Sequence, residues 1–231
     1  MPLQTVFLDA GGVLIHPNWV RVSAALGKQG VHVDAATLRA AEPRAKRQLD
    51  AARVVGGTTD ARRGWLYFDL ILEEARVQAS EATAAALAEL HDYHTRENLW
   101  EYVPPNVPRV LEALRARGLQ LVVVSNANGR LRDVLRRLAI DRYFHHILDS
   151  FEEGVEKPDP RLFQIALQKA GADAATTIHV GDLYEIDVVG ARGAGIRGVL
   201  LDEGGLYTDV DCPRVRSLDD LSDQIALGTF G

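Results

Sequence analysis

The sequence predicts an α/β protein with a parallel sheet and an inserted bundle of helices. Short apolar runs that end on small polar residues alternate with amphipathic patterns after residue 100. Between residues 17 and 99 the patterns are helical, without a convincing strand. The 231 residues also exceed a typical domain of about 100–200 residues. We therefore expect a core of residues 1–16 and 100–231 and an inserted helical domain of residues 17–99.

Apolar, β-branched runs predict the strands. Their apolar character on both faces is typical of strands buried beneath helices on both sides of a sheet. The first run stops at Asp9, and the next stops at Ser125-Asn126, more than a hundred residues later. The predicted strands are 5–8, 121–124, 177–180 and 198–201, with 145–148 as a possible fifth.

Apolar residues spaced three and four apart predict the helices. In the core such patterns begin at residues 107, 131 and 162, and the last one ends at Gly171. In the insertion, helical signals cover residues 19–28, 35–54, 59–77 and 80–94, which predicts a four-helix module. Pro17 and the Pro104-Pro105 pair bracket this module like hinges.

Composition excludes several classes of protein. The net charge of −6 argues against a general nucleic-acid binder, which needs a basic surface to release phosphate counterions. Cys212 is the only cysteine, so the chain has no intrachain disulfide and no cysteine-rich metal site, as in a reducing compartment. No apolar run reaches the roughly 18 residues of a membrane span, and residues 1–11 lack signal-peptide features. We expect a soluble, cytoplasmic protein without nucleic-acid or membrane partners; its oligomeric state is open.

Polar side chains follow the predicted strands. Ligands bind outside the carboxyl ends of strands in an open parallel sheet, so these groups can converge although they lie far apart in sequence. A lysine in the loop 156–160 can join them. The candidate residues are Asp9, Ser125, Asn126, Lys157, Asp182 and Asp187.

The three carboxylates of Asp9, Asp182 and Asp187 would repel one another unless a cation lay among them. Mg²⁺ prefers such hard oxygen ligands and also accepts backbone carbonyls and water. Ser125 and Lys157 could then neutralise an anion on the other side. This combination suits phosphoryl transfer through a covalent aspartyl phosphate.

Four segments together resemble the motifs of the haloacid dehalogenase-like hydrolase superfamily, in its branch with a helical cap. Each segment is weakly specific alone, but four in this order and spacing are specific, and the resemblance covers essentially the whole chain. It implies a Rossmann-like α/β core with the helical bundle as cap. The segments are 8–14, 122–126, 157–160 and 181–187, the last followed by Gly190-Ala191.

The resemblance implies a role for each candidate. Asp9 would be the nucleophile and, with the backbone carbonyl of Gly11 and with Asp182, would bind Mg²⁺. Asp187 would support the metal through water or orient Lys157. Ser125 and the amide of Asn126 would hold the phosphoryl oxygens, and Lys157 would screen the charge between nucleophile and substrate.

Gly11 departs from the pattern of the family's phosphatases, which usually carry a general acid/base Asp there. Such a group contributes about 10²–10⁴-fold to rate. One interpretation is a phosphatase of small phosphorylated molecules that lacks this acid or uses a substitute, with His16 as the nearest candidate.

Three other interpretations stay open. A 2-haloacid dehalogenase acting on a halogenated substrate needs no such acid and no metal, but those relatives usually have an aromatic residue at position 11, a small neutral residue at 182 and a Tyr at 163. This chain has Gly11, Asp182 and Phe163 instead. A binding or regulatory protein without turnover is another alternative. Phosphonate cleavage through a lysine of the cap, which has only Lys28 and Lys46, ranks last.

Overall fold

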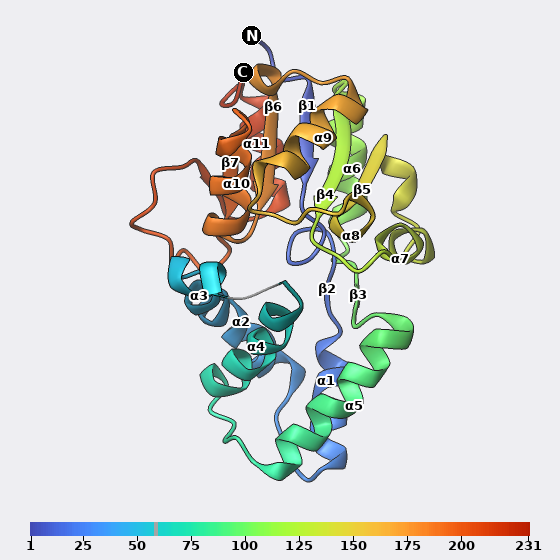
Figure 1. Ribbon diagram of the computed structural model, residues 1–231, viewed down its shortest axis with the longest axis vertical. Coiled ribbons are helices and arrows are strands. Elements are labelled where there is room, and N and C mark those ends of the chain that lie inside the picture. The colour runs from blue at the N-terminus through green and yellow to red at the C-terminus, as the bar shows by residue number, and fades with distance from the viewer. Residues whose placement is uncertain (58–59) are drawn as a thin grey trace. The chain divides into compact units, whose positions relative to one another are not determined.

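Six parallel strands form the main sheet (Figure 1). The computed structural model describes residues 1–57 and 60–231. The strand order is β5-β4-β1-β6-β7-β8, so the first strand lies inside the sheet, between β4 and β6. The strands are β1 (Thr5–Leu8), β4 (Gln120–Ser125), β5 (His146–Asp149), β6 (Thr177–Gly181), β7 (Arg197–Leu201) and β8 (Arg214–Val215).

Helices cover the sheet and connect its strands. In Figure 1, α9 lies in front of the sheet and contacts α10, whereas α6 lies behind it and contacts α11. The α-helices of this part are α6 (Val107–Ala116), α7 (Leu131–Arg137), α8 (Ser150–Glu153), α9 (Pro160–Ala170), α10 (Val189–Gly193) and α11 (Leu218–Ala226). Two 3₁₀-helices, η1 (Asp141–Tyr143) and η2 (Ala174–Thr176), and one π-helix, η3 (Tyr184–Val188), complete it.

The helix α9 shows how local sequence fixes an element. Asp159 accepts a hydrogen bond from the N–H of Arg161, Pro160 occupies the first turn, and Gly171 ends the helix at a φ of 60°. The buried face of α9 then packs against the sheet. One buried apolar cluster contains Phe7, Val122, Val124 and Leu148 from the strands and Leu162, Phe163 and Ala166 from the helix.

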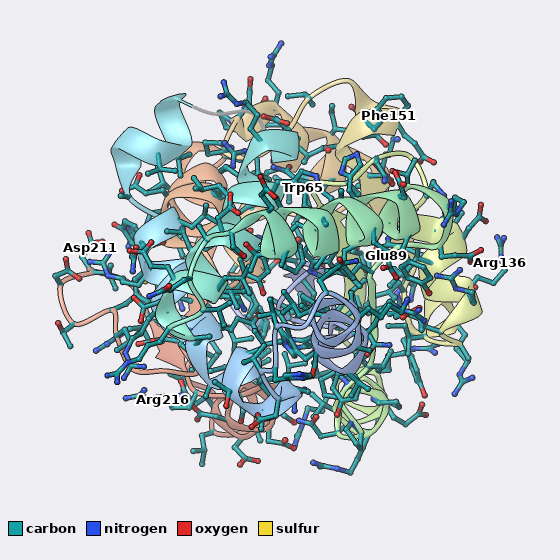
Figure 2. The ribbon with its side chains drawn as sticks, turned by 90° about the horizontal axis from the view of Figure 1, so that it is seen from below. Trp65, Glu89, Arg136, Phe151, Asp211 and Arg216 are labelled. Carbon is teal, nitrogen blue, oxygen red and sulfur yellow. The ribbon has the colours of Figure 1, made fainter. Side chains whose placement is uncertain are left out.

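The chain divides into two compact units, one of residues 1–15 and 103–231 and one of residues 16–102. The second unit begins and ends with a short antiparallel pair, β2 (His16–Pro17) and β3 (Trp100–Tyr102). Its helices are α1 (Trp19–Lys28), α2 (Ala35–Leu49), α3 (Ala52–Gly57), α4 (Asp60–Glu74) and α5 (Glu81–Glu97). Contacts between aromatic rings join these helices. The ring centroid of Trp65 in α4, which is labelled in Figure 2, lies 4.5 Å from that of His91 in α5.

The predicted fold class is confirmed: a parallel Rossmann-like core with an inserted, mainly helical segment. The single helix predicted over 35–54 is wrong, because α2 ends at Leu49 and α3 begins at Ala52. Apolar spacing continues across so short a break and therefore does not reveal it. The predicted helix start at residue 59 lies outside the described residues. Within the described ranges, no helix has both the length and the apolar character needed to cross a membrane.

Candidate active site

The carboxyl ends of three neighbouring strands define the candidate site. Leu8 of β1 is aligned with Val123 of β4 and with Val180 of β6. The N–H of Asp9 donates to the carbonyl of Val180 at 2.9 Å, which continues the strand pairing one residue further. Asp9 therefore lies beside the ends of β4 and β6, where Ser125 completes β4.

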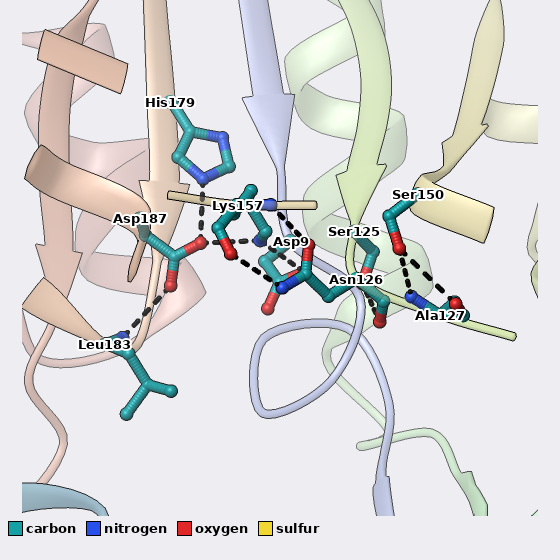
Figure 3. A network of polar contacts seen from close by, with 9 residues as sticks. All are labelled: Asp9, Ser125, Asn126, Ala127, Ser150, Lys157, His179, Leu183 and Asp187. Carbon is teal, nitrogen blue, oxygen red and sulfur yellow. Dashed lines mark hydrogen bonds and ion pairs between the residues drawn. The ribbon is translucent and has the colours of Figure 1, made fainter. Parts of the chain in front are cut away.

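Lys157 lies between two carboxylates (Figure 3). Its Nζ is 2.9 Å from Oδ1 of Asp9 and 2.6 Å from Oδ1 of Asp187, and its side chain is 1% exposed. Burial alone would lower the pKa of the ammonium, but attraction to Asp187 and Asp9 raises that pKa above its ordinary value. Lys157 is therefore charged throughout the physiological pH range.

Both oxygens of Asp187 have partners. Its Oδ1 accepts the bond from Lys157 and also lies 3.0 Å from Nε2 of His179, while Oδ2 accepts from the N–H of Leu183 at 3.1 Å (Figure 3). Burial would raise the pKa of this carboxyl, but Lys157 and His179 lower it far below its ordinary value. Asp187 is thus an ionised carboxylate held in one orientation.

A glycine makes room for this carboxylate. Asp187 lies in the π-helix η3, and its N–H donates to the carbonyl of Leu183 at 2.8 Å, so the turn folds back toward β6. A Cβ atom added to Gly181 would lie 2.0 Å from Cγ of Asp187. The end of β6 therefore requires a residue without a side chain.

Asp9 is less fully compensated than Asp187. Burial raises the pKa of its carboxyl above the ordinary value, opposed by Lys157 and by a hydrogen bond from Ser125, while Asp187 raises it further. Its Oδ1 is buried and lies 2.9 Å from Nζ of Lys157. Asp9 and Asp187 thus share the one ammonium group of Lys157.

Asn126 fixes the backbone of Lys157. Its Oδ1 accepts from the N–H of Lys157 at 2.7 Å, and its Nδ2 donates to the carbonyl of the same residue at 3.0 Å. The side-chain amide thus replaces two backbone partners that this loop lacks. The predicted role of Asn126 in binding phosphoryl oxygens therefore depends on its backbone amide, since its side chain holds the lysine loop.

The end of β5 holds the loop that follows Ser125. Asp149 is 1% exposed, and its Oδ2 accepts from the N–H groups of Gly129 and Leu131 at 2.8 and 3.2 Å. Ser150 exchanges hydrogen bonds with the backbone of Ala127 at 3.1 and 3.3 Å. These two residues were not predicted from the sequence, although they too are polar residues where a strand ends.

The predicted metal ligands lie close together. One carboxylate oxygen each from Asp9, Asp182 and Asp187 can be chosen so that all three lie within 4.8 Å of one another. Hard oxygen donors at this spacing are the kind of ligand set that Mg²⁺ takes. Gly11, the fourth predicted ligand, lies in the loop two residues after Asp9 and forms a bridge with Ile15.

His16 belongs to the second unit and is buried there. Burial is the main reason that its pKa falls to about 4, and Lys46 and Arg39 lower it further while Glu42 raises it. A histidine with this pKa is neutral at pH 7 and lacks the acidic imidazolium proton that a general acid gives to a leaving group. The structure therefore gives no support to His16 as a substitute general acid.

The fold is thus a Rossmann-like α/β core with an inserted helical unit, and the candidate site is an acidic edge of the sheet at which Lys157 bridges two carboxylates. The model of the haloacid dehalogenase-like hydrolase family matches residues 3–195, and the chain belongs to this family.

Relatives of the chain include named hydrolases and phosphatases. The chain is 31% identical over 194 residues to haloacid dehalogenase-like hydrolase domain-containing protein 3 of Bos taurus, covering 81% of this chain and 76% of that protein. It is 32% identical over 158 residues to a glyceraldehyde 3-phosphate phosphatase of Methanopyrus kandleri, covering 68% and 65%. It spans only 55–58% of the proteins that share the bovine protein's name in four other vertebrates.

Solved structures of the family share the fold. A putative hydrolase from Bacillus subtilis, solved with magnesium, matches with a TM-score of 0.70 at 15% identity, over 97% of this chain and 99% of that one. A 2-haloacid dehalogenase from Pseudomonas syringae matches with a TM-score of 0.59 at 27% identity, over 97% and 99%. Both phosphatases and dehalogenases are therefore among the relatives, and the residues of the site must distinguish between them.

Proposed function

We propose that this hydrolase is a Mg²⁺-dependent phosphatase of small phosphorylated molecules that acts through an aspartyl phosphate on Asp9. The observation that carries the proposal is the cluster of three carboxylates within 4.8 Å beside one buried lysine. Such an excess of negative charge calls for a cation, and a cation at this place suits an anionic substrate. The phosphatase name of the archaeal relative agrees with this proposal.

The proposed ligands of Mg²⁺ are Asp9, Asp182 and the backbone carbonyl of Gly11. The buried carboxylate of Asp9 and the neighbouring carboxylate of Asp182 are hard oxygen donors of the kind that such an ion takes. Asp187 would act on the metal through water, or on Lys157; its direct bond to Lys157 favours the second role. When bound, Mg²⁺ would neutralise charge on the transferring phosphoryl group.

In the proposed reaction, the carboxylate of Asp9 attacks phosphorus, and the bond from phosphorus to the leaving oxygen breaks. The hydroxyl of Ser125 and the amide of Asn126 bind the phosphoryl oxygens, and Lys157 keeps nucleophile and substrate from repelling each other. Water then cleaves the aspartyl phosphate and frees Asp9. Because Gly11 supplies no acid, the leaving oxygen takes its proton from solvent, which favours substrates with good leaving groups.

The alternative is a 2-haloacid dehalogenase that forms an ester on Asp9 without metal. Three positions argue against it: Asp182 is acidic where those enzymes have a neutral residue, Gly11 is not aromatic, and Phe163 has no hydroxyl. Phe163 is fully buried and packs edge-on against His179, 4.8 Å between ring centroids. This packing suits a residue of the apolar core beneath the site.

The proposal is tested by release of phosphate from p-nitrophenyl phosphate with and without Mg²⁺. We expect hydrolysis that needs the metal, that EDTA abolishes, and that Asp9→Asn eliminates. Arg161→Gln, which removes an exposed partner of Asp159, is a control that should leave the rate unchanged. Metal-independent chloride release from 2-chloropropionate, with no phosphate release, would establish the dehalogenase instead. Binding of Mg²⁺ and phosphate without either reaction would indicate a non-hydrolytic protein.

A second test follows the intermediate. Without a base at Gly11 to activate water, the aspartyl phosphate should be long-lived. Rapid quenching followed by mass spectrometry should then find one phosphoryl group on the peptide that contains Asp9. Turnover without an initial burst would contradict a slow second step.

The proposal also assigns roles to the two domains and a compartment to the protein. Residues 17–99 would act as the cap domain, and residues 1–16 with 100–231 as the catalytic domain. The protein would act in the cytoplasm, in keeping with the single Cys212.

A further inference from the structure

His179 is a fully buried imidazole that the proposed chemistry does not use. It lies on β6, two residues before Gly181, and therefore on the same face of the sheet as that glycine. Its Nε2 lies 3.0 Å from Oδ1 of Asp187, and its ring packs edge-on against Phe163 (Figure 3). Its Nδ1 is buried and has no partner among the described residues. The ring is thus placed by one polar contact and one aromatic contact.

The contact with Asp187 determines which nitrogen carries the proton. An ionised carboxylate only accepts hydrogen bonds, so Nε2 of His179 is the donor. Asp187 then receives donors on both oxygens, from Lys157 and His179 on Oδ1 and from the N–H of Leu183 on Oδ2. Of the two donors on Oδ1, only His179 stands on a strand of the sheet. His179 is therefore the rigid contact that sets where this oxygen lies.

Among the described residues, Asp187 and Asp9 are the groups that hold the ammonium of Lys157 in place. Asn126 fixes its backbone on both sides, but the four-carbon side chain can still take many conformations. Its Nζ is directed by Asp187 at 2.6 Å and by Asp9 at 2.9 Å. Asp9 is the proposed nucleophile and must be free to react. Asp187 is therefore the carboxylate that can keep its ion pair with Lys157 throughout the reaction.

We propose that His179 is a positioning residue: by donating from Nε2 to Asp187, it holds the ammonium of Lys157 against Asp9. The proposal rests on the phosphatase function in that the rate is one of its readouts. It differs from a purely structural role, in which the imidazole only fills space beside Phe163. Two substitutions separate these roles, because His179→Phe keeps an aromatic ring and removes the donor, whereas His179→Gln restores an N–H near the position of Nε2.

Thr177→Val is the matched control. Thr177 lies on the same strand and the same face as His179, is also buried in the sheet, and donates a hydrogen bond to the carbonyl of Asp173 at 2.7 Å. Its loss disturbs β6 without touching Asp187. Any change seen in His179→Phe but not in Thr177→Val therefore comes from the donor to Asp187.

The kinetic experiment uses the whole 231-residue chain with p-nitrophenyl phosphate and Mg²⁺. We expect His179→Phe to lower kcat by about 10–100-fold, the usual effect of losing a group that orients a ligand, with a much smaller change in KM. His179→Gln should recover most of kcat, and Thr177→Val should keep it. Combining His179→Phe with Asp187→Asn should lower kcat no further than Asp187→Asn alone, because both act through one carboxylate. Equal rates in His179→Phe and Thr177→Val would overturn the proposal.

A second readout does not need turnover. Nitrogen-15 NMR should show the proton of His179 on Nε2, and a slowly exchanging ammonium signal from Lys157 that disappears in His179→Phe and returns in His179→Gln. If the wild-type protein hydrolyses nothing, the proposed function fails while this spectrum still judges the positioning of Lys157. A proton on Nδ1, or a Lys157 signal unchanged in His179→Phe, would overturn it.

Discussion

Lys157 brings a full positive charge into the interior of the first unit, where it is tolerated only because two carboxylates surround it. Its contacts of 2.9 Å with Asp9 and 2.6 Å with Asp187 are both buried. Removing one member of such a buried set leaves uncompensated charge and is strongly destabilising. The residue therefore serves stability as well as the proposed reaction.

We predict that Lys157→Met lowers the free energy of unfolding by about 3–5 kcal/mol, because it leaves Asp9 and Asp187 facing each other without a cation. Urea unfolding at pH 7 without Mg²⁺ measures this change. Lys169→Met is the control, since that lysine is half exposed and pairs with Glu153 at the surface. It should cost at most about 1 kcal/mol. Equal losses in the two variants would mean that the buried ion pairs of Lys157 contribute no more to the free energy of unfolding than the surface pair of Lys169 does.

Gly11 gives a second prediction at the scale of one residue. It is not among the glycines with positive φ, so an L residue can take its backbone conformation. Gly11→Asp should raise the rate of p-nitrophenyl phosphate hydrolysis, up to the roughly 10²–10⁴-fold of a general acid/base. Gly11→Asn, which cannot exchange the proton, is the control. An unchanged rate in a folded Gly11→Asp protein that binds Mg²⁺ would mean that another group already does this work.

Individual residues of the site were predictable where they immediately follow a strand. Asp9 and Asp182 do so, Ser125 is the last residue of β4, and the parallel sheet brings all three to one edge. The role of His179 was not predicted. It lies in a strand whose residues are apolar on both faces, and nothing in the local sequence indicates that its side chain contacts Asp187. The two hydrogen bonds between the side chain of Asn126 and the backbone of Lys157 could not be predicted either, because they join loops 31 residues apart in sequence.

At the scale of elements, the junction between β6 and the π-helix η3 controls the geometry of Asp187. The π-helix turns the chain so that the carboxylate lies against the strand it has just left. The space for it exists only because Gly181 has no side chain. The glycine before Asp182 is therefore required by packing within the site, beyond any need for a flexible turn.

We predict that Gly181→Ala displaces Asp187 and costs about 1–3 kcal/mol of stability, as overpacking does in a filled interior. It should also release Lys157 and lower kcat. Gly27→Ala is the contrast: this glycine lies in α1 without a positive φ, and a Cβ added there would meet no atom within 4 Å. That substitution should be neutral or stabilising by up to about 1 kcal/mol. Thermal unfolding and the rate on p-nitrophenyl phosphate check both. Full activity in Gly181→Ala would show that Asp187 can move without consequence.

The short strand β2 carries a pH-dependent contribution to stability through His16. Its pKa is about 4 in the folded chain and about 6.5 when unfolded. Between these values the unfolded chain binds more protons, so the free energy of unfolding falls as pH drops from 6.5 to 4, by about 3 kcal/mol in total. His16→Gln should flatten this part of the curve, whereas exposed His32→Gln should follow the wild type. Denaturant titrations at several pH values measure it; parallel curves for all three proteins would contradict the assignment.

Elements were predictable in proportion to their length. Strands of four to six residues with continuous apolar character were identified, as was the helical character of the insertion. The strands β2, β3 and β8 have only two or three residues and show no periodicity. Their existence depends on pairing partners elsewhere in the fold, which local sequence does not encode.

For the whole molecule, the first unit is discontinuous in sequence and the second is continuous. The antiparallel pairing of His16 with Tyr102 brings the two ends of the second unit together. The insertion therefore leaves and re-enters the first unit at nearly one point, which suits an independently folding unit.

We predict that residues 1–15 and 103–231, joined by a short Gly/Ser linker in place of the insertion, fold cooperatively, because this part has its own buried sheet and apolar cluster. Circular dichroism during heating should show one sharp transition. Residues 16–102 expressed alone, with their own buried aromatic cluster, should likewise be helical. Loss of the sharp transition in the first protein would mean that its core depends on the insertion.

The place of β1 inside the sheet has a consequence for biosynthesis. This strand is translated before the other strands of the sheet, and its neighbours β4 and β6 begin only at Gln120 and Thr177. At about 5–20 residues per second, β1 waits roughly 6–20 s for its first partner, while the continuous second unit can already fold. Asp9 is then translated long before Lys157 and Asp187, so the buried charge cluster closes only when nearly the whole sheet has been made.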